Sequence, residues 1–203
     1  METIVKEKIV PGKTIQGGMT CVIVQNEITN FNNWKKAYEA NVENRKKAGI
    51  SELLVLRDVS NPNYVSVILG VSDVSSSKAF FNDPETAQLM REAGVISKPR
   101  FTYFKVSDSG TNPNPDYLIV RHRIAEYEKW KPAFDHHETV RANYNIRLVA
   151  VGKDLDDPAN IVAVFNSNQA SNFTDFLEKS NLKDVMHDTG VISEPVVDIL
   201  KLA

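Results

Sequence analysis

Gly94-Val95-Ile96-Ser97-Lys98-Pro99 returns in this chain as Gly190-Val191-Ile192-Ser193-Glu194-Pro195, at an offset of 96 residues. The same offset aligns the two halves without a gap from Cys21/Tyr117 to Val106/Leu202 and places Trp34 on Trp130. The repeating unit is about a hundred residues long, which is the size of a small domain and too long for a solenoid repeat. The sequence therefore predicts a tandem duplication.

The repeated stretch has the pattern of a helix end followed by a strand start. With Gly94 at position C′, Val95 is C″ and Met90 is C3, the two residues that touch in a Schellman cap. Pro99 then stands at the start of a strand, where the loss of a backbone donor is tolerated. Because the second copy repeats this arrangement, we interpret the stretch as structural rather than catalytic.

In copy one the hydrophobic periodicity changes between strand and helix. The first strand, 21–28, alternates apolar and polar residues, and Asn30 follows as a candidate N-cap. One helix is expected from there to Gly49, with a face formed by Trp34, Ala37, Tyr38, Asn41, Arg45 and Ala48. Further elements are expected as strands at 53–57, 64–71 and 100–106 and helices at 75–82 and 84–93.

The resulting order in each copy is β-α-β-β-α-β, that of a ferredoxin-like fold. Such a unit covers one face of its sheet with helices and leaves the other face bare. The third strand is apolar on both faces in both copies (64–71 and 161–165), so the bare face needs cover. The predicted fold class is α+β, with two tandem ferredoxin-like βαββαβ repeats packed sheet to sheet as a pseudo-dimeric barrel. Exchange of repeats with a second chain is the alternative.

The chain divides into four segments on this interpretation. Residues 1–19 are an N-terminal appendage, in which Ile4 to Val10 could add an edge strand. Repeat one is 20–106 and repeat two is 116–203. The segment 107–115 contains no apolar side chains apart from two prolines and is expected to be a linker.

Composition excludes several classes of function. A net charge of −2 and a pI near 6.1 lack the basic surplus of nucleic-acid-binding proteins. The first ten residues have no apolar core of a signal peptide, and no apolar run reaches the roughly 20 residues of a membrane span. The single cysteine, Cys21, lies in an apolar strand and is expected to be packed. We expect a cytoplasmic protein without nucleic-acid or membrane partners, either a monomeric pseudo-dimer or a homodimer.

Parts of copy two resemble a known superfamily. The residues concerned are Ile119-Val120-Arg121-His122, Trp130-Lys131-Pro132-Ala133-Phe134-Asp135, His137, Arg141, Asp156-Asp157-Pro158 and Gly190-Val191. They are similar to the dimeric α+β barrel superfamily, including its small antibiotic-biosynthesis-monooxygenase-like members. The resemblance covers most of 116–202 and, more weakly, 20–106. It implies a fused version of what is usually a homodimer, in a superfamily that hosts oxygenases, isomerases, haem-handling enzymes and members without assigned chemistry.

The two copies differ at positions that could carry chemistry. His122 and His137 of copy two correspond to Asn26 and Asn41 of copy one. On a functional interpretation, one half keeps a site that the other half has altered. On a structural interpretation, these positions need only a polar side chain that forms hydrogen bonds, which an imidazole or an amide can do. Both interpretations stay open at the level of sequence.

Both copies keep an arginine, Arg45 or Arg141, on the helix stripe that faces the sheet. It lies on the same helix face as the tryptophan of its copy, Trp34 or Trp130. An arginine at such a position needs a carboxylate, a carbonyl or an anionic ligand as partner. We expect a structural salt bridge. Contact with a carboxylate or phenolate of a ligand is the alternative.

A metal site is not expected. His137 should lie roughly 15 Å along its helix, so that His122 is nearer to Trp130 than to His137. No zinc-type spacing of cysteine and histidine occurs. One further segment has the composition of an ordinary turn, and it contains Asp154, Asp156 and Asp157.

Haem chemistry, which the resemblance raises, would need an iron-ligating histidine together with a tryptophan and an asparagine. Asn26 and His187 could supply two of these parts, but both tryptophans lie on first helices. We therefore predict no cofactor.

The function expected is binding of a small aromatic or anionic molecule, with a cofactor-independent, monooxygenase-like activity. In that case His122 or His137 would be the catalytic base. The substrate-binding candidates are Trp130, Arg141, Asn26, Asn41 and Arg45. The alternative is a non-catalytic binding or structural module. A cavity lined by His122, Trp130 or Arg141 would favour a ligand-binding protein.

Overall fold

The structure of the protein is a computed structural model that describes residues 14–110 and 114–203. The extra strand expected between Ile4 and Val10 lies outside the described residues. Repeat one contains β1 (Thr20–Glu27), α1 (Phe31–Ala40), α2 (Val42–Lys47), β2 (Ile50–Asp58), β3 (Tyr64–Val71), α3 (Val74–Asn82), α4 (Pro84–Glu92) and β4 (Arg100–Ser109). Repeat two contains β5 (Asp116–Arg123), α5 (Tyr127–His136), α6 (Glu138–Asn143), β6 (Arg147–Asp154), β7 (Asn160–Ser167), α7 (Ser171–Lys179), α8 (Leu182–Asp188) and β8 (Val196–Leu202).

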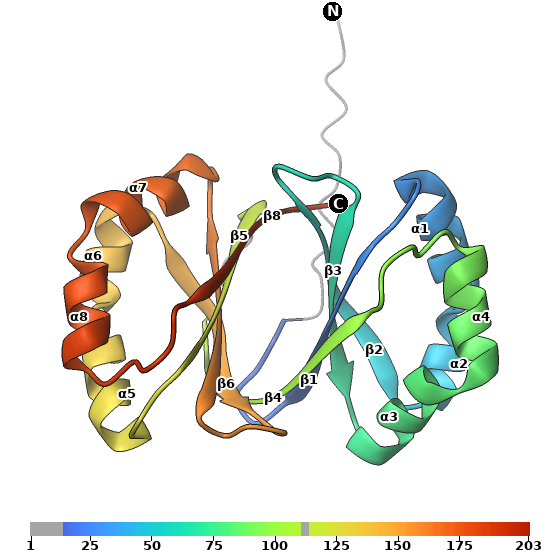
Figure 1. Cartoon of the computed structure of the whole chain (residues 1–203), viewed down its shortest axis with the longest axis horizontal. Coiled ribbons are helices and arrows are strands. Elements are labelled where there is room, and N and C mark those ends of the chain that lie inside the picture. Colours follow the sequence, from blue (N-terminus) through green and yellow to red (C-terminus); the bar gives the residue numbers. More distant parts are fainter. Residues whose placement is uncertain (1–13, 111–113) are drawn as a thin grey trace, which may run out of the picture.

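The strands form one closed antiparallel barrel in the order β1-β3-β2-β8-β5-β7-β6-β4. Each repeat contributes a four-stranded sheet of ferredoxin-like order, and the two sheets face each other across the interior. The helices cover the outer face of each sheet, at the two ends of the molecule (Figure 1). The predicted α+β fold, with two repeats packed sheet to sheet as a pseudo-dimeric barrel, is confirmed.

Two seams join the repeats. At one, β2 pairs with β8 from Leu56↔Leu202 to Asp58↔Leu200. At the other, β4 pairs with β6 over a longer stretch, from Phe104↔Asp154 to Ser109↔Ala150. The prediction of a linker from residue 107 is wrong for its first three residues. β4 continues to Ser109 because these residues find backbone partners on β6.

Apolar side chains fill the barrel interior. Cys21 and Ile23 of β1 point inward, and Ile15, from the segment before β1, is buried among them at 3% exposure. The other interior residues include Leu56, Ile68, Phe104, Ile119, Val162, Val164 and Leu200. Cys21 is fully buried, so it is a packed core residue, as expected, and this burial raises the pKa of its thiol to about 12. Two further cores lie between the sheets and their helices.

The helix caps expected from the repeated stretch are present in both copies. Gly94 has a φ of 92°, the Val95 amide donates to the Met90 carbonyl at 3.0 Å, and the Gly94 amide donates to the Arg91 carbonyl at 2.9 Å. This is the Schellman pattern. Gly190, with a φ of 84°, repeats it.

The single helix predicted up to Gly49 is wrong, because the helix breaks at Asn41. Asn41 has φ −94° and ψ 15°, which separates α1 from α2. The backbone N–H of Asn41 donates to the carbonyl of Tyr38, three residues back, at 3.3 Å, so the α-helical i→i−4 pattern is interrupted there. Repeat two breaks at the equivalent residue, His137.

No helix among the described residues is long and apolar enough to span a membrane.

Candidate functional site

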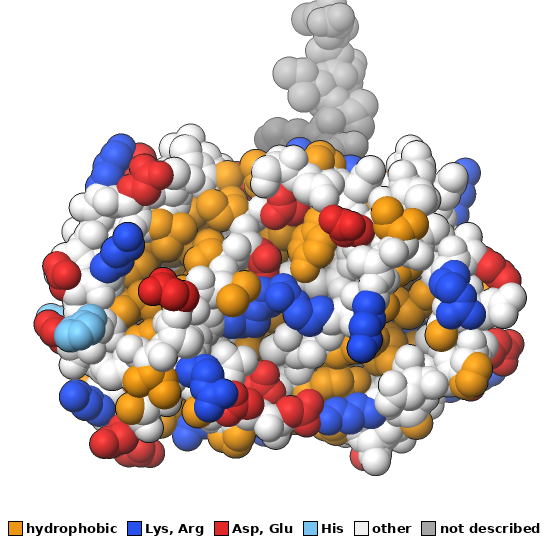
Figure 2. Space-filling model, viewed as in Figure 1, with side chains coloured by type: hydrophobic (Ala, Val, Ile, Leu, Met, Phe, Trp, Pro, Cys, Tyr) orange, Lys and Arg blue, Asp and Glu red, His pale blue; other side chains and the backbone are white. Residues whose placement is uncertain are grey.

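Each repeat holds a cavity between its sheet and its helices. The cavity of repeat two measures about 850 Å³ and that of repeat one about 500 Å³. Figure 2 shows apolar side chains open to view between the outer helices and the sheet on the left, where repeat two lies. The larger cavity is lined by the predicted residues His122, Trp130, His137 and Arg141. The smaller one is lined by the predicted residues Asn26, Asn41 and Arg45, together with Trp34.

Strand alternation places His122 in this cavity. Leu118, Val120 and His122 of β5 face the helices and line the cavity, whereas Ile119 and Arg121 face the barrel interior. The side chain of His122 is 5% exposed, and neither ring nitrogen has a hydrogen-bond partner among the described residues. Its ring centroid lies 5.6 Å from that of Trp130.

Burial governs the protonation of His122. It lowers the pKa of this imidazole from 6.5 to about 4, because the charged form would lose its hydration without gaining a partner. His122 is therefore neutral at pH 7. A neutral imidazole offers one acceptor and one donor, and no described residue pairs with either.

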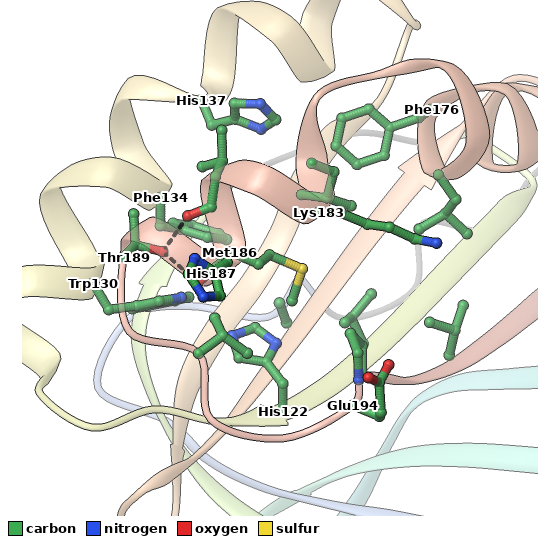
Figure 3. A pocket seen from close by; sticks show the side chains of 18 of the residues that line it. His122, Trp130, Phe134, His137, Phe176, Lys183, Met186, His187, Thr189 and Glu194 are labelled. Carbon is green, nitrogen blue, oxygen red and sulfur yellow. Dashed lines mark hydrogen bonds between the residues drawn. The ribbon is translucent and has the colours of Figure 1, made fainter.

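His137 lies at a different part of the same cavity. Its Nε2 atom is 3.3 Å from Oδ1 of Asn181, and its ring packs 5.8 Å from that of Phe176. Burial lowers the pKa of His137, and the hydrogen bond with Asn181 opposes this shift. In Figure 3, His122 and His137 lie on opposite sides of Met186. They do not converge on a metal, and the described residues contain no group of three or more potential metal-ligating side chains.

Arg141 is buried but forms no salt bridge with a described residue, so the expected ion pair is wrong. Its Nη1 atom donates to the carbonyl of Phe134 at 2.8 Å, one of the carbonyls left open where α5 ends. Arg45 makes the equivalent bond to Tyr38. The guanidinium carbon of Arg141 also lies 4.4 Å from the Phe134 ring centroid. Burial lowers its pKa to about 10, so Arg141 remains cationic at neutral pH.

The remaining walls of the larger cavity are mostly apolar, and most of the residues that form them were not predicted from the sequence. They come from α7, α8, the loop before β8 and β8 itself, and include Phe176, Leu177, Leu182, Val185, Met186, Val191 and Val197. The repeated stretch thus lines the cavity from Val191 to Pro195 as well as capping a helix. Its copy after Gly94 does not line the smaller cavity. Exposed Lys183, His187 and Glu194 stand at the rim.

The haem-type set suggested by the resemblance is not brought together. Asn26 lines the cavity of repeat one, whereas His187 lines that of repeat two. The His187 side chain is 89% exposed and contacts Asp188. The residues present therefore do not assemble the expected combination, and no step is assigned to haem.

The aspartates near the start of β7 form a turn, as expected. Asp154 accepts hydrogen bonds from the backbone amides of Asp156 and Asp157 at 2.8 and 3.3 Å. Asp156 pairs with Lys78 and Asp157 with Arg123. These carboxylates hold the loop instead of converging on a cation.

Comparison with known proteins supports the fold but not a particular activity. No protein-family model matches the sequence, and a search of curated proteins finds no significant match. Among solved structures, an anthrone oxidase-like protein superposes with a TM-score of 0.64 at 13% identity, covering 93% of this chain and 94% of the other. A "putative monooxygenase" from Lactobacillus acidophilus gives 0.59 at 12% identity, covering 91% and 94%. Chlorite dismutase from Candidatus Nitrospira defluvii gives 0.58 at 9% identity, covering 92% of each chain. The chain has the fold of a dimeric α+β barrel.

Proposed function

We propose that the cavity of repeat two binds a small, largely apolar aromatic molecule and that His122 acts on it as a general base in a cofactor-independent oxidation. The observation that carries this proposal is the state of His122. It is a buried, neutral imidazole whose ring nitrogens have no partner among the described residues, at the wall of a cavity of about 850 Å³. An unpaired buried polar group is costly, and a ligand that pairs with it recovers that cost.

The size and lining of the cavity favour an aromatic ligand. Its volume lies within the range of roughly 300–1,000 Å³ that is usual for small-molecule sites. Trp130 stacks on Phe134 with centroids 4.7 Å apart, and both line the cavity. Aromatic walls of this kind favour flat ligands through stacking and edge contacts.

The anthrone oxidase-like neighbour suggests the chemistry. In anthrone a CH₂ group lies between two aromatic rings and is acidified by a ketone. His122 would remove one of its protons, and the resulting carbanion would react with O₂. One oxygen atom would replace the two hydrogens as a carbonyl, and the other would leave as water. O₂ is thus the oxidant and is reduced by four electrons, in balance with oxidation of CH₂ to C=O.

Arg141 would assist by charge. It lines the same cavity and keeps its positive charge at neutral pH, so it would attract an anionic or phenolic group of the ligand. Its bond to the Phe134 carbonyl uses only Nη1, which leaves other guanidinium donors for a ligand. We infer that His137, held by Asn181, shapes the far side of the site.

A non-catalytic binding protein is the second candidate, and the pKa of His122 favours it. General bases work best when their pKa is near the working pH, and a pKa of about 4 makes this imidazole a weak base. The same neutral ring is well suited to hold a ligand hydroxyl by a hydrogen bond. The two candidates share a site and differ in whether the ligand is consumed.

The test is to incubate the purified protein with anthrone in aerated buffer at pH 7, following O₂ uptake and the absorbance of anthraquinone. The variant is His122→Asn, the residue type that repeat one carries at this position. Loss of a general base should slow turnover by about 100-fold or more. His136→Asn is the matched control, because its side chain is exposed and does not line the cavity.

The outcomes separate the two candidates. Anthrone binding by calorimetry, without O₂ uptake above the protein-free rate, would support the binding module and reject the enzyme. Equal turnover by the wild type and His122→Asn would reject His122 as the base. Absence of anthrone binding would reject the proposed substrate class.

A further inference from the structure

We propose that the smaller cavity, in repeat one, is a second ligand site with a different specificity. Its ligand is a neutral, planar molecule that carries a hydrogen-bond donor beside an acceptor, as a cis-lactam does. The cavity measures about 500 Å³ and lies between strands β1 and β3 and the helices of repeat one. This volume is large enough for a small bicyclic molecule. The inference does not depend on the function proposed for repeat two.

The side chain of Asn26 identifies this cavity as a binding site. Asn26 lies on the helix-facing side of β1, in line with Val22 and Val24, and is 3% exposed. Its amide forms no hydrogen bond with another described residue, although a carboxamide can form four. Buried amides almost always have partners. An amide that lines a cavity without a partner therefore indicates a ligand that completes it.

The shape of a carboxamide defines the matching group. Its carbonyl oxygen and N–H donor lie side by side in one plane, so the complementary ligand presents N–H and C=O in the reverse order. A cis-lactam does this with two parallel hydrogen bonds. The imidazole of His122 cannot form the same pair, because its two nitrogens point in different directions from the ring. The exchange of histidine for asparagine between the repeats thus changes which ligand is recognised.

Aromatic side chains make the cavity suitable for a flat ligand. Trp34 is 5% exposed and stacks on Tyr38, with centroids 4.9 Å apart and an interplanar angle of 15°. Phe80 and Phe81 line the cavity from α3. Planar rings bury their faces against such walls without losing much rotational freedom.

Charge selects a neutral ligand. The guanidinium carbon of Arg45 lies 3.6 Å from the Tyr38 ring centroid, and its Nη1 donates to the Tyr38 carbonyl. Exposed Glu85 lines the same cavity with the opposite charge, so the lining presents no net charge to an ionic ligand. Because a carboxamide has no basic group that titrates near physiological pH, Asn26 would hold a ligand without acting on it as a base.

The two tryptophans allow each cavity to be observed separately, since Trp34 lines one and Trp130 the other. The experiment titrates ¹⁵N-labelled protein with 2-quinolinone, a bicyclic cis-lactam, and follows the two indole Nε1–H signals. Trp34→Phe and Trp130→Phe variants assign them. The expected result is a saturable shift of the Trp34 signal. An unchanged Trp34 signal, or a shift confined to Trp130, would overturn the proposal.

Two controls test the donor–acceptor pair. N-methyl-2-quinolinone keeps the acceptor and loses the donor, so it should bind about tenfold more weakly to the unaltered protein. Asn26→Leu should weaken the binding of 2-quinolinone by a similar factor, whereas His122→Leu should leave the titration of the Trp34 signal unchanged. Equal binding of the two quinolinones to the wild type would overturn the assignment to Asn26, whether or not Asn26→Leu folds.

Discussion

Gln25 and Arg121 occupy the same position in their respective repeats, 96 residues apart, and touch each other inside the barrel. Nη1 of Arg121 donates to Oε1 of Gln25 at 2.8 Å. The approximate twofold axis that relates the repeats therefore passes between these two side chains. A symmetric homodimer would place two identical residues here. The fused chain places an amide against a guanidinium, and Asp198 completes the cluster by pairing with Arg121 and accepting from Gln25 at 3.0 Å.

Removal of Arg121 should destabilise the barrel strongly. The side chains of Arg121 and Asp198 are only 7% and 14% exposed, so Arg121→Leu leaves a poorly solvated carboxylate. The expected loss is about 3 kcal/mol in the free energy of unfolding, measured with urea. Arg123→Leu is the control, because the pair of Arg123 with Asp157 is 53% and 38% exposed and should contribute at most about 1 kcal/mol. Equal losses would show that burial of the pair is unimportant.

Stability should fall as the pH is lowered from 6.5 to 4 because of His122. The pKa of this residue drops from 6.5 to about 4 on folding, so in this interval the unfolded chain binds a proton that the folded protein excludes. The full effect is about 3 kcal/mol below pH 4. His122→Asn should flatten the pH dependence of urea unfolding over this interval. His187→Asn, with an exposed side chain, should keep the wild-type curve. A parallel curve for His122→Asn would contradict the prediction.

The two cap glycines should respond differently to alanine. Both have positive φ, which disfavours a side chain by about 1–2 kcal/mol. A Cβ at Gly94 would also lie 2.4 Å from Oγ1 of Thr29, whereas a Cβ at Gly190 would meet only the Cβ of Ala125, at 3.7 Å. Gly94→Ala should therefore lower the melting temperature more than Gly190→Ala. Equal shifts would mean that Thr29 rotates away without cost.

Gly152→Ala should disrupt the longer seam. A Cβ there would lie 2.0 Å from the carbonyl oxygen of Lys105 and 2.7 Å from its carbonyl carbon, and backbone cannot move aside without separating β4 from β6. We expect a loss of about 3 kcal/mol or more in unfolding free energy, as for severe overpacking. Gly17→Ala, whose nearest atom is 3.9 Å away, is the matched control. Amide exchange should locate the loss at the strand β4–β6 pairing.

Much of the fold could be predicted from sequence because its signals are local or repeated. The Met90–Gly94–Val95 cap depends on a six-residue pattern, and the offset fixed by this pattern pairs Trp34 with Trp130. The face-to-face packing of the two sheets was predicted from the third strand of each repeat, which is apolar on both faces. The helix break at Asn41 was missed because the apolar face continues through it.

The site was only partly predictable. A cavity lined by His122, Trp130 or Arg141 was named from the sequence as the observation that would favour ligand binding, and all three line the cavity of repeat two. The predicted partner of Arg141, a carboxylate, was wrong. The observed partner is the backbone carbonyl of Phe134, which a pattern of side chains cannot reveal. The contact between Gln25 and Asp198 spans 173 residues and depends on how the two sheets close, which no local spacing reports.

The continuous chain through both halves of the barrel has a consequence for divergence. In a homodimer of identical units, one codon sets the residue in both cavities, so a change that benefits one cavity is imposed on the other. Here the cavity of His122 and that of Asn26 are encoded separately, while the shared barrel holds them together at any protein concentration. One half can therefore acquire a new specificity while its twin keeps the old one.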